Sequence, residues 1–476
     1  MQIVSIMFFV FLAIVFSLLY VCNKFVKNTD KKINVFKWIL LIASYIFVIY
    51  ADYRFAIILF AISFCAYFVA KKGKYYAVGI IIPILALGYF KYTNFFIESF
   101  ANILGRDYTL LNLILPLGIS FYSFSAISYM VDVKRGKIEP RSFKDVALYV
   151  SYFPKITSGP IQRSSDFFNE VDKEVKIGWE TFLTGIQIFA FGLFKKIVVA
   201  DRLSVFVNQV YDAPLAFSSL TVFLATLAYS LQIYFDFSGY SDMAIGVSKI
   251  IGINLPRNFN LPYLSRNVTE LWKRWHISLS SWLQEYLYIS LGGSRKGKIR
   301  TYVNLILTMV IGGIWHGANW TYIIWGLLHG VALAVHKVWM LITKSPDKKH
   351  GAVSNVVSIV ITFLFVNFCW IFFRAPSFDV AMTIIGRIVA FDAGITQIFA
   401  WFIFAVIVYI IGMTCAVVKS KREGLVSRKH NMCPVEGYYP LMDLSKFTSQ
   451  VIFFVFLGLI IALAHTGGSP FIYGNY

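Results

Sequence analysis

Long, uninterrupted apolar runs recur from one end of the chain to the other and determine the expected architecture. Each run approaches the ~20 residues that an α-helix needs to cross a bilayer, which is too long and too continuous for the strands of a barrel. Lipid cannot hydrogen-bond an exposed backbone, so such runs fold as helices. The expected spans lie near residues 3–21, 36–51, 55–70, 77–96, 110–131, 181–200, 217–235, 301–316, 320–336, 352–373, 395–417 and 449–466. The pattern predicts an all-α polytopic membrane protein.

The stretch between residues 143 and 293 departs from this pattern. Its segments 146–167 and 256–293 mix proline, glycine, aromatic and charged residues at expected membrane depth. Irregular backbone is tolerated there only where protein buries it or where it lines a cavity. Within the second segment, five large apolar residues recur at helical spacing opposite three charged residues. The apolar five are Leu271, Trp275, Leu279, Trp282 and Tyr286, and the charged three are Lys273, Arg274 and Glu285. We expect an interfacial or re-entrant amphipathic helix.

Composition supports a single intramembrane domain. The 476 residues are 58% hydrophobic and 14% charged, whereas soluble domains carry about 25% charged residues. No polar linker long enough to separate domains interrupts the chain, so one domain is expected over residues 1–476. Within it we distinguish N-terminal helices at 1–100 and C-terminal helices at 350–476.

The net charge of +20 reports membrane topology. Basic residues cluster in short loops between apolar runs, and acid-balanced or nearly uncharged loops alternate with them, which is the positive-inside rule. The loops 24–32, 71–74, 295–300 and 344–349 are therefore predicted to be cytoplasmic, with the tail after His465 outside. The first run lacks a basic n-region and a convincing cleavage site, so we expect a retained span with the N-terminus outside. We therefore expect no nucleic-acid partner.

Several kinds of chemistry find no support in the sequence. The cysteines stand singly, mostly inside apolar runs, and no spacing suggests a metal site or a disulfide framework. They are Cys22, Cys65, Cys369, Cys415 and Cys433. The chain also lacks G-x-S-x-G, H-E-x-x-H, a Walker loop and G-x-G-x-x-G, which argues against an α/β serine hydrolase, a zincin and a nucleotide-driven pump. We expect no bound metal or cofactor.

His316 stands out among seven histidines. It lies at the break between two apolar helices, within Gly312–Trp320, and a helix entering near Arg300 carries it about 20–25 Å across the membrane. An ionisable group at such depth is costly and marks a functional site by default. Asn319 and neighbouring amides could donate hydrogen bonds to a developing oxyanion. A structural histidine in a helix hairpin is the open alternative.

The other histidines have less suggestive surroundings. His329 lies inside a span among leucine and glycine, where packing is favoured over catalysis. His336 and His465 lie at span ends and fit structural roles, while His350 and His430 fall in basic loops and should be solvated.

Histidine suits acyl transfer to an alcohol. A hydroxyl is too weak an acid to ionise near neutral pH, so it needs a base whose pKa lies near the working pH. Imidazole, with an ordinary pKa of ~6.5, is such a base.

Several motifs resemble the membrane-bound O-acyltransferase (MBOAT) family. They occur in one order between about residues 110 and 340, which marks that stretch as the catalytic core. They are Leu115–Tyr122, Phe153-Pro154 with Ser158–Pro160, Tyr234–Ser241, Asn258–Tyr263, Glu270–Ser280, Trp282–Gly293 and Trp315–Trp320. Within the family, the chain is most similar to bacterial members that acetylate alginate, peptidoglycan or cellulose. Proteins that pass D-alanine towards teichoic acids are more distantly similar.

The resemblance implies a fold and a set of site residues. The fold would be a ring of about eleven to twelve transmembrane helices, with re-entrant or interfacial helices, around a central funnel. His316 matches the family's catalytic histidine, and His276 matches a second histidine of the bacterial branch. Substrate-contacting candidates beside them are Trp315, Asn319, Arg274 and Asp236. Gln284 departs from the family pattern, which usually has a basic residue there, so donor contact at that position is in doubt.

The resemblance also implies a function in the bacterial inner membrane. The acyl group, acetyl by subfamily likeness, would pass from cytoplasmic acetyl-CoA or an acyl carrier towards hydroxyls of an extracytoplasmic polysaccharide. An extracytoplasmic acyltransferase would be the partner protein. Two alternatives stay open: D-alanyl transfer for teichoic acids, and a transporter or flippase without bond chemistry.

Overall fold

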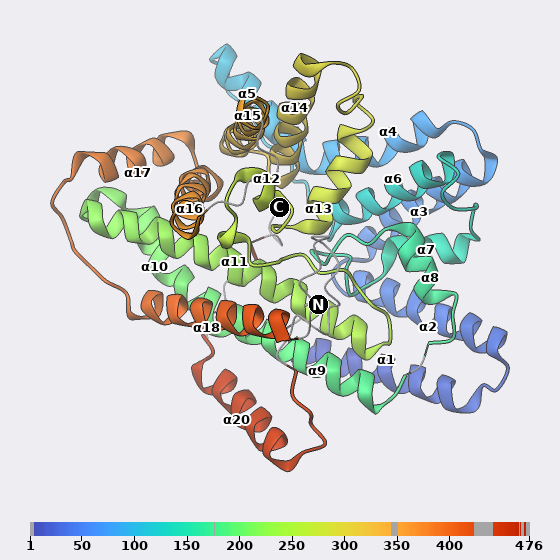
Figure 1. The fold of residues 1–476 in the computed structure, drawn as a ribbon. Helices are drawn as coiled ribbons and strands as arrows, with labels where there is room; N and C mark the ends of the chain where they lie inside the picture. The colour runs from blue at the N-terminus through green and yellow to red at the C-terminus, as the bar shows by residue number, and fades with distance from the viewer. Residues whose placement is uncertain are drawn as a thin grey trace. The chain divides into compact units, whose positions relative to one another are not determined.

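The computed structural model describes residues 4–175, 177–343, 351–422, 441–465, 467 and 471–472, all of which are helical or irregular apart from one β-bridge between Phe217 and Ile395 (Figure 1). The predicted all-α class is confirmed. Some sequence predictions fall outside the described residues: the loop 344–349, His350, His430, Cys433 and most of the tail after His465.

Nine helical segments among the described residues are long and apolar enough to cross a membrane. They are Ile6–Phe25, Thr29–Ile49, Tyr53–Lys72, Tyr76–Leu104, Trp179–Asp212, Ser219–Ile250, Trp320–Thr343, Ala352–Arg374 and Ala400–Val418. Three further helices lie where spans were expected but are shorter or more polar, namely α6 (Ile119–Lys134), α14 (Lys298–His316) and α20 (Phe447–Leu463). The span expected at 110–131 is thus wrong at its start, because the helix begins only at Ile119. The ring and the funnel stay predictions.

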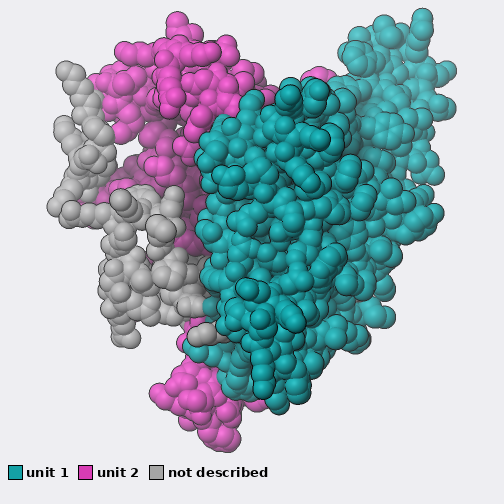
Figure 2. All heavy atoms as spheres, turned by 90° about the vertical axis from the view of Figure 1, so that its right-hand side faces the viewer, with its two compact units in different colours: residues 1–191, 240–256 teal, residues 192–239, 257–476 magenta. Residues whose placement is uncertain are grey.

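Backbone packing divides the chain into two compact units, coloured separately in Figure 2. The first comprises residues 1–191 and 240–256, and the second comprises residues 192–239 and 257–476. The expected single domain over 1–476 stays a prediction.

The first unit holds the N-terminal helices, whose ends follow local sequence signals. They are α1 (Ile6–Phe25), α2 (Thr29–Ile49), α3 (Tyr53–Lys72), α4 (Tyr76–Leu87), α5 (Thr93–Leu104), α6, α7 (Phe143–Ser151), α8 (Ser164–Val171) and most of α9 (Trp179–Leu193). The side chain of Asp52 caps α3 by accepting a hydrogen bond from the Arg54 amide, and α3 ends at Gly73, whose φ of +63° suits a residue without a side chain.

The second unit holds the helices on which the predicted site lies. They are α10 (Asp201–Asp212), the first part of α11 (Ser219–Ile250), α12 (Val268–Trp272), α13 (Ile277–Trp282), the π-helical turn η5 (Leu283–Tyr288), α14, α15 (Trp320–Thr343), α16 (Ala352–Arg374), α17 (Phe378–Ala390), α18 (Ala400–Arg422) and α20. Figure 1 shows α14 and α15 running side by side. The short helix α12 packs against α15, and η5, which continues from α13, packs against α14.

The amphipathic stretch is not one helix, which corrects the expectation from its spacing. It breaks between Trp272 and Ile277, and continues as α13 and η5. His276 at the break has a φ of +42°, which a continuous α-helix does not permit. The five apolar residues of the stripe are all buried, while Lys273 is exposed.

Glycines bring α14 and α15 into close backbone contact. A Cβ at Gly313 would lie 2.2 Å from the carbonyl oxygen of Tyr322, and one at Gly326 would lie 2.4 Å from that of Met309. No side chain fits at these distances, so the glycines fix how closely the helix that carries His316 approaches its neighbour.

We expect Gly313→Ala to destabilise the protein by about 1–3 kcal/mol, because the added methyl group forces the two helices apart. Since this displaces His316, acyl transfer should fall sharply as well. Thermal stability of the purified protein in detergent measures the first effect. Gly412→Ala in α18 is the matched control, because a Cβ there meets nothing within 4 Å. Equal stability of the two variants would contradict the proposed role of the close contact.

Candidate active site

His316 is the last residue of α14 and is enclosed by aromatic rings. Only 3% of the residue is exposed. Its imidazole centroid lies 5.1 Å from the ring of Trp325 and 5.2 Å from that of Phe373. The next residue, Gly317, is extended and ends the helix. His316 lies at the end of a helix, where the sequence places it, and its imidazole is surrounded by aromatic rings that the sequence did not indicate.

His276 and His316 both lie close to the indole ring of Trp315. The Trp315 ring is 5.0 Å from His316 and 6.4 Å from His276, measured between centroids. Nδ1 of His276 lies 3.4 Å from Oδ1 of Asn258, and that oxygen also accepts a hydrogen bond from the Ser278 hydroxyl at 2.6 Å. The structure therefore brings together His316, His276 and Trp315, although 40 residues separate the two histidines in sequence.

A cavity of about 530 Å³ opens between the short helices and the α14–α15 pair. Its lining is mostly apolar, includes two lysines and contains no carboxylate. The lining residues are Thr269, Trp272, Lys273, Ile277, Ser280, Ser281, Leu283, Gln284, Tyr288, Leu305, Thr308, Met309, Leu333, His336, Lys337 and Met340. A cavity of this size is in the range of small-molecule sites, and its two cations favour an anionic ligand.

The cavity and His316 share one face of α14. Leu305, Thr308 and Met309 line the cavity, and Gly312 and His316 follow at the spacing of one helical face. Leu283 of the cavity wall lies 3.2 Å from where a Cβ of Gly312 would be. At 1.5 Å per residue, His316 is about 12 Å beyond Thr308 along the helix. A ligand in the cavity could thus extend along α14 towards the imidazole.

Arg274 is engaged in a structural ion pair. Its Nη2 donates to Oε1 of Glu270 at 2.8 Å, and its Nη1 donates to the carbonyl oxygen of Asn260 at 3.1 Å. Burial alone would raise the pKa of Glu270, but hydrogen bonds from the Arg266 amide and the charge of Arg274 outweigh it and lower the pKa. The neighbouring Lys273 lines the cavity instead. Substrate contact by Arg274 stays a prediction.

Asn319 holds the turn between α14 and α15. Its Nδ2 donates to the carbonyl oxygen of Pro376 at 2.8 Å, and its Oδ1 accepts from the Thr321 amide at 2.9 Å. Oxyanion contact by this side chain stays a prediction.

Asp236 belongs to a buried charge cluster with Lys196 and Asp201. Lys196 Nζ lies 2.5 Å from an Asp236 oxygen and 2.8 Å from an Asp201 oxygen, and all three side chains are at most 3% exposed. Asp236 also accepts a hydrogen bond from the Ile472 amide at 2.8 Å. These contacts fit the anchoring of a C-terminal segment, so substrate contact stays a prediction for this residue too.

The sequence interpretation overlooked the part of α15 that lines the cavity. Leu333, His336, Lys337 and Met340 recur at helical spacing and form that wall. The spacing was readable in the sequence, but it is equally typical of a lipid-facing or packed helix face. Only the position of α12 and α13 opposite makes it a cavity wall.

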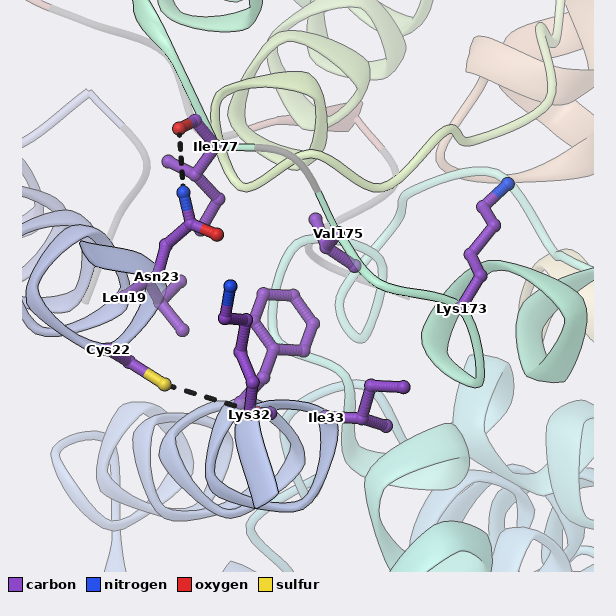
Figure 3. A pocket seen from close by; sticks show the side chains of 9 residues that line it. Leu19, Cys22, Asn23, Lys32, Ile33, Lys173, Val175 and Ile177 are labelled. Carbon is purple, nitrogen blue, oxygen red and sulfur yellow. Dashed lines mark hydrogen bonds between the residues drawn. The ribbon is translucent and has the colours of Figure 1, made fainter. Parts of the chain in front are cut away.

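A second hollow lies in the first unit and has no catalytic features. Asn23 donates to the carbonyl oxygen of Ile177 at 3.2 Å, and Cys22 contacts the carbonyl oxygen of Lys32 (Figure 3). Its volume of about 10 Å³ has room for about one water molecule. Among the described residues, no group of three or more histidine, cysteine, aspartate and glutamate side chains could hold a metal ion.

Comparison with known proteins supports the motif resemblance. The family model for MBOAT, the membrane-bound O-acyltransferase family, matches residues 112–374. The chain is 40% identical over 350 residues to the peptidoglycan O-acetyltransferase of Helicobacter pylori, covering 68% of this chain and 66% of that protein. It is 38% identical over 406 residues to a probable alginate O-acetylase of Pseudomonas syringae, covering 81% and 74%. A teichoic acid D-alanyltransferase of Bacillus subtilis is 31% identical over 281 residues, covering 56% and 70%.

The matched region includes every part of the candidate site. It runs from the loop before α6 to the end of α16, and so contains both histidines, the aromatic rings around His316 and the whole cavity lining. The relatives that align over most of the chain carry O-acetyltransferase and O-acetylase names, and the D-alanyltransferase aligns over a smaller share. By this match and by its helical membrane architecture, the chain belongs to the membrane-bound O-acyltransferase family.

Proposed function

We propose that this protein transfers acetyl from a cytoplasmic thioester to hydroxyls of an extracytoplasmic polysaccharide, with His316 as the general base. The observation that carries this proposal is the placement of a buried imidazole on the same face of α14 as a cavity with two lysines. The peptidoglycan and alginate relatives supply the acceptor class. We place the protein in the bacterial inner membrane.

The cavity suits an acetyl donor that carries phosphate. Lys273 and Lys337 supply positive charge, and Leu305, Leu333 and Met340 supply apolar wall for a flexible arm. The basic segment 295–300 includes the start of α14 and is predicted to be cytoplasmic, so a donor would enter from that side. Acetyl-CoA and an acyl carrier with a phosphopantetheine arm both have this chemistry.

The reaction needs one base and balances without a cofactor. Neutral His316 takes the proton of the acceptor hydroxyl while the hydroxyl oxygen bonds to the thioester carbonyl carbon. The carbon–sulfur bond then breaks, and the leaving thiolate takes the proton back from the imidazolium. His276, which lies close to the same Trp315 ring as His316, would orient the acceptor or the donor. The first acceptor would be a hydroxyl of a partner transferase outside the membrane, which passes the acetyl group to the polysaccharide.

The relation to a teichoic acid D-alanyltransferase favours one alternative, transfer of D-alanine. Chemical analysis of the cell envelope distinguishes acetyl transfer from D-alanyl transfer. Cells that lack the protein should lose ester-linked acetate that mild alkali releases from the polysaccharide fraction, and the chain supplied on a plasmid should restore it. Loss of ester-linked D-alanine with unchanged acetate would overturn the acetyl assignment in favour of the alternative.

A further inference from the structure

His329 on α15 is buried with both ring nitrogens unsatisfied. The residue is 1% exposed, and neither Nδ1 nor Nε2 has a hydrogen-bond partner within the part of the chain that the structure describes. The indole nitrogens of Trp272, Trp325 and Trp370 around it also have no acceptor there. Leaving a buried polar group unpaired costs roughly 1–3 kcal/mol, so several in one cluster indicate that a ligand with polar groups completes it.

This cluster lies between the cavity and His316. Trp272 lines the cavity, and its ring is 5.2 Å from His329 and 5.7 Å from Trp325. Trp325 in turn contacts both imidazoles, with its ring centroid 5.0 Å from that of His329 and 5.1 Å from that of His316. On α15, His329 also precedes the cavity residues Leu333 and His336 by one and two turns. His329 itself does not line the cavity, but a donor arm that runs from the cavity past Trp272 and Trp325 to His316 would pass close to it.

The chemistry of a thioester arm complements a neutral imidazole. One ring nitrogen donates a hydrogen bond and the other accepts one. A secondary amide likewise has one N–H and one carbonyl oxygen. The arms of coenzyme A and of acyl carriers both place such an amide two methylene groups from the sulfur, so an acetyl group held at His316 leaves this amide a few ångströms away.

We propose that His329 binds the donor by hydrogen-bonding the amide nearest the thioester. The inference rests on the proposed function, since it requires a thioester donor in the cavity. His329 is then a substrate-binding residue that favours donors whose arm carries this amide. The same contact serves acetyl-CoA and carrier-bound acetyl groups, because both carry this amide.

The test compares two small acetyl thioesters in inverted membrane vesicles that contain the acceptor. S-acetyl-N-acetylcysteamine carries the amide, and S-pentyl thioacetate replaces it with methylene groups in a chain of the same length. The parent protein should prefer the first roughly tenfold in kcat/KM, as expected for one or two buried hydrogen bonds. His329→Phe keeps a ring but removes both nitrogens, so the preference should fall to about one while the rate with S-pentyl thioacetate changes little.

Two further variants guard against a general folding defect. His329→Gln keeps a donor and an acceptor and should retain most of the preference. Leu327→Phe adds a phenyl ring to the exposed face of the same helix, outside the cavity lining, and should retain it fully.

The outcomes separate this inference from the proposed function. A preference that survives in His329→Phe, or an equal loss of rate with both thioesters, overturns the role of His329 alone. If the parent protein transfers acetyl from neither thioester and from no coenzyme A or carrier donor, the proposed function fails and the inference fails with it.

Discussion

Replacing His316 with alanine is expected to abolish polysaccharide acetylation. A general base contributes typically 10²–10⁴-fold to a rate, and the loss here should reach or exceed the upper end of that range. His316 is only 3% exposed and is walled by Trp325 and Phe373, so water has little room to act as a substitute base. The measurement is the ester-linked acetate content of polysaccharide from cells that carry only the variant.

A matched change should spare activity. His465→Ala removes an imidazole that lies outside the cavity lining and outside the region matched by the family model, and should retain most of the acetylation. Both variants must reach the membrane at parental levels. Wild-type acetate content in the His316→Ala strain would disprove the assignment of the base.

Filling the cavity should be nearly as damaging. Thr308 is buried in α14 and lines the cavity, so Thr308→Trp places an indole in the route that the donor takes to His316. Displacing reacting groups by about 1 Å can cost 10²-fold, and we expect a decrease in kcat/KM for the donor on the order of 100-fold. Initial rates in inverted vesicles over a range of donor concentrations measure this.

The preceding residue provides the control for size and hydrophobicity. Leu307 is 39% exposed on another face of α14 and is not part of the cavity lining, so Leu307→Trp should leave the donor kinetics unchanged. Equal kinetics for the two variants would show that the donor does not use this cavity.

The sequence predicted the helices better than it predicted their interruptions. Whether a segment can span a membrane depends on the hydrophobicity of its residues and on its length, and both can be read from the sequence. The break at His276 could not be read from the sequence, because the apolar stripe of Leu271, Trp275 and Leu279 continues through it. There the backbone follows tertiary packing, with Asn258 bonded to Ser278 and the amide of Asn260 bonded to the carbonyl of Arg274.

The sequence identified a site residue only where the position of that residue along the chain is itself unusual. His316 is notable because an ionisable group at membrane depth is costly. The partners of Arg274 and Asp236 could not be foreseen in the same way. The acidic partner of Arg274, Glu270, lies one turn away, but Lys196 lies 40 residues before Asp236. The cavity depends on α12, α13, α14 and α15 coming together, which no local pattern specifies.

The central claim is that an acetyl group from a cytoplasmic donor passes through this protein to an extracytoplasmic acceptor in a reaction that needs His316. Sealed inverted vesicles that contain the polysaccharide and any partner protein, supplied outside with acetyl-labelled coenzyme A or labelled carrier, test it most directly. The account predicts labelled acetyl esters on the polysaccharide in vesicles with the parent protein, and none above background with equal amounts of His316→Ala. Equal labelling of the polysaccharide by the parent protein and by His316→Ala would contradict this account. So would intact labelled donor inside vesicles whose polysaccharide carries no label.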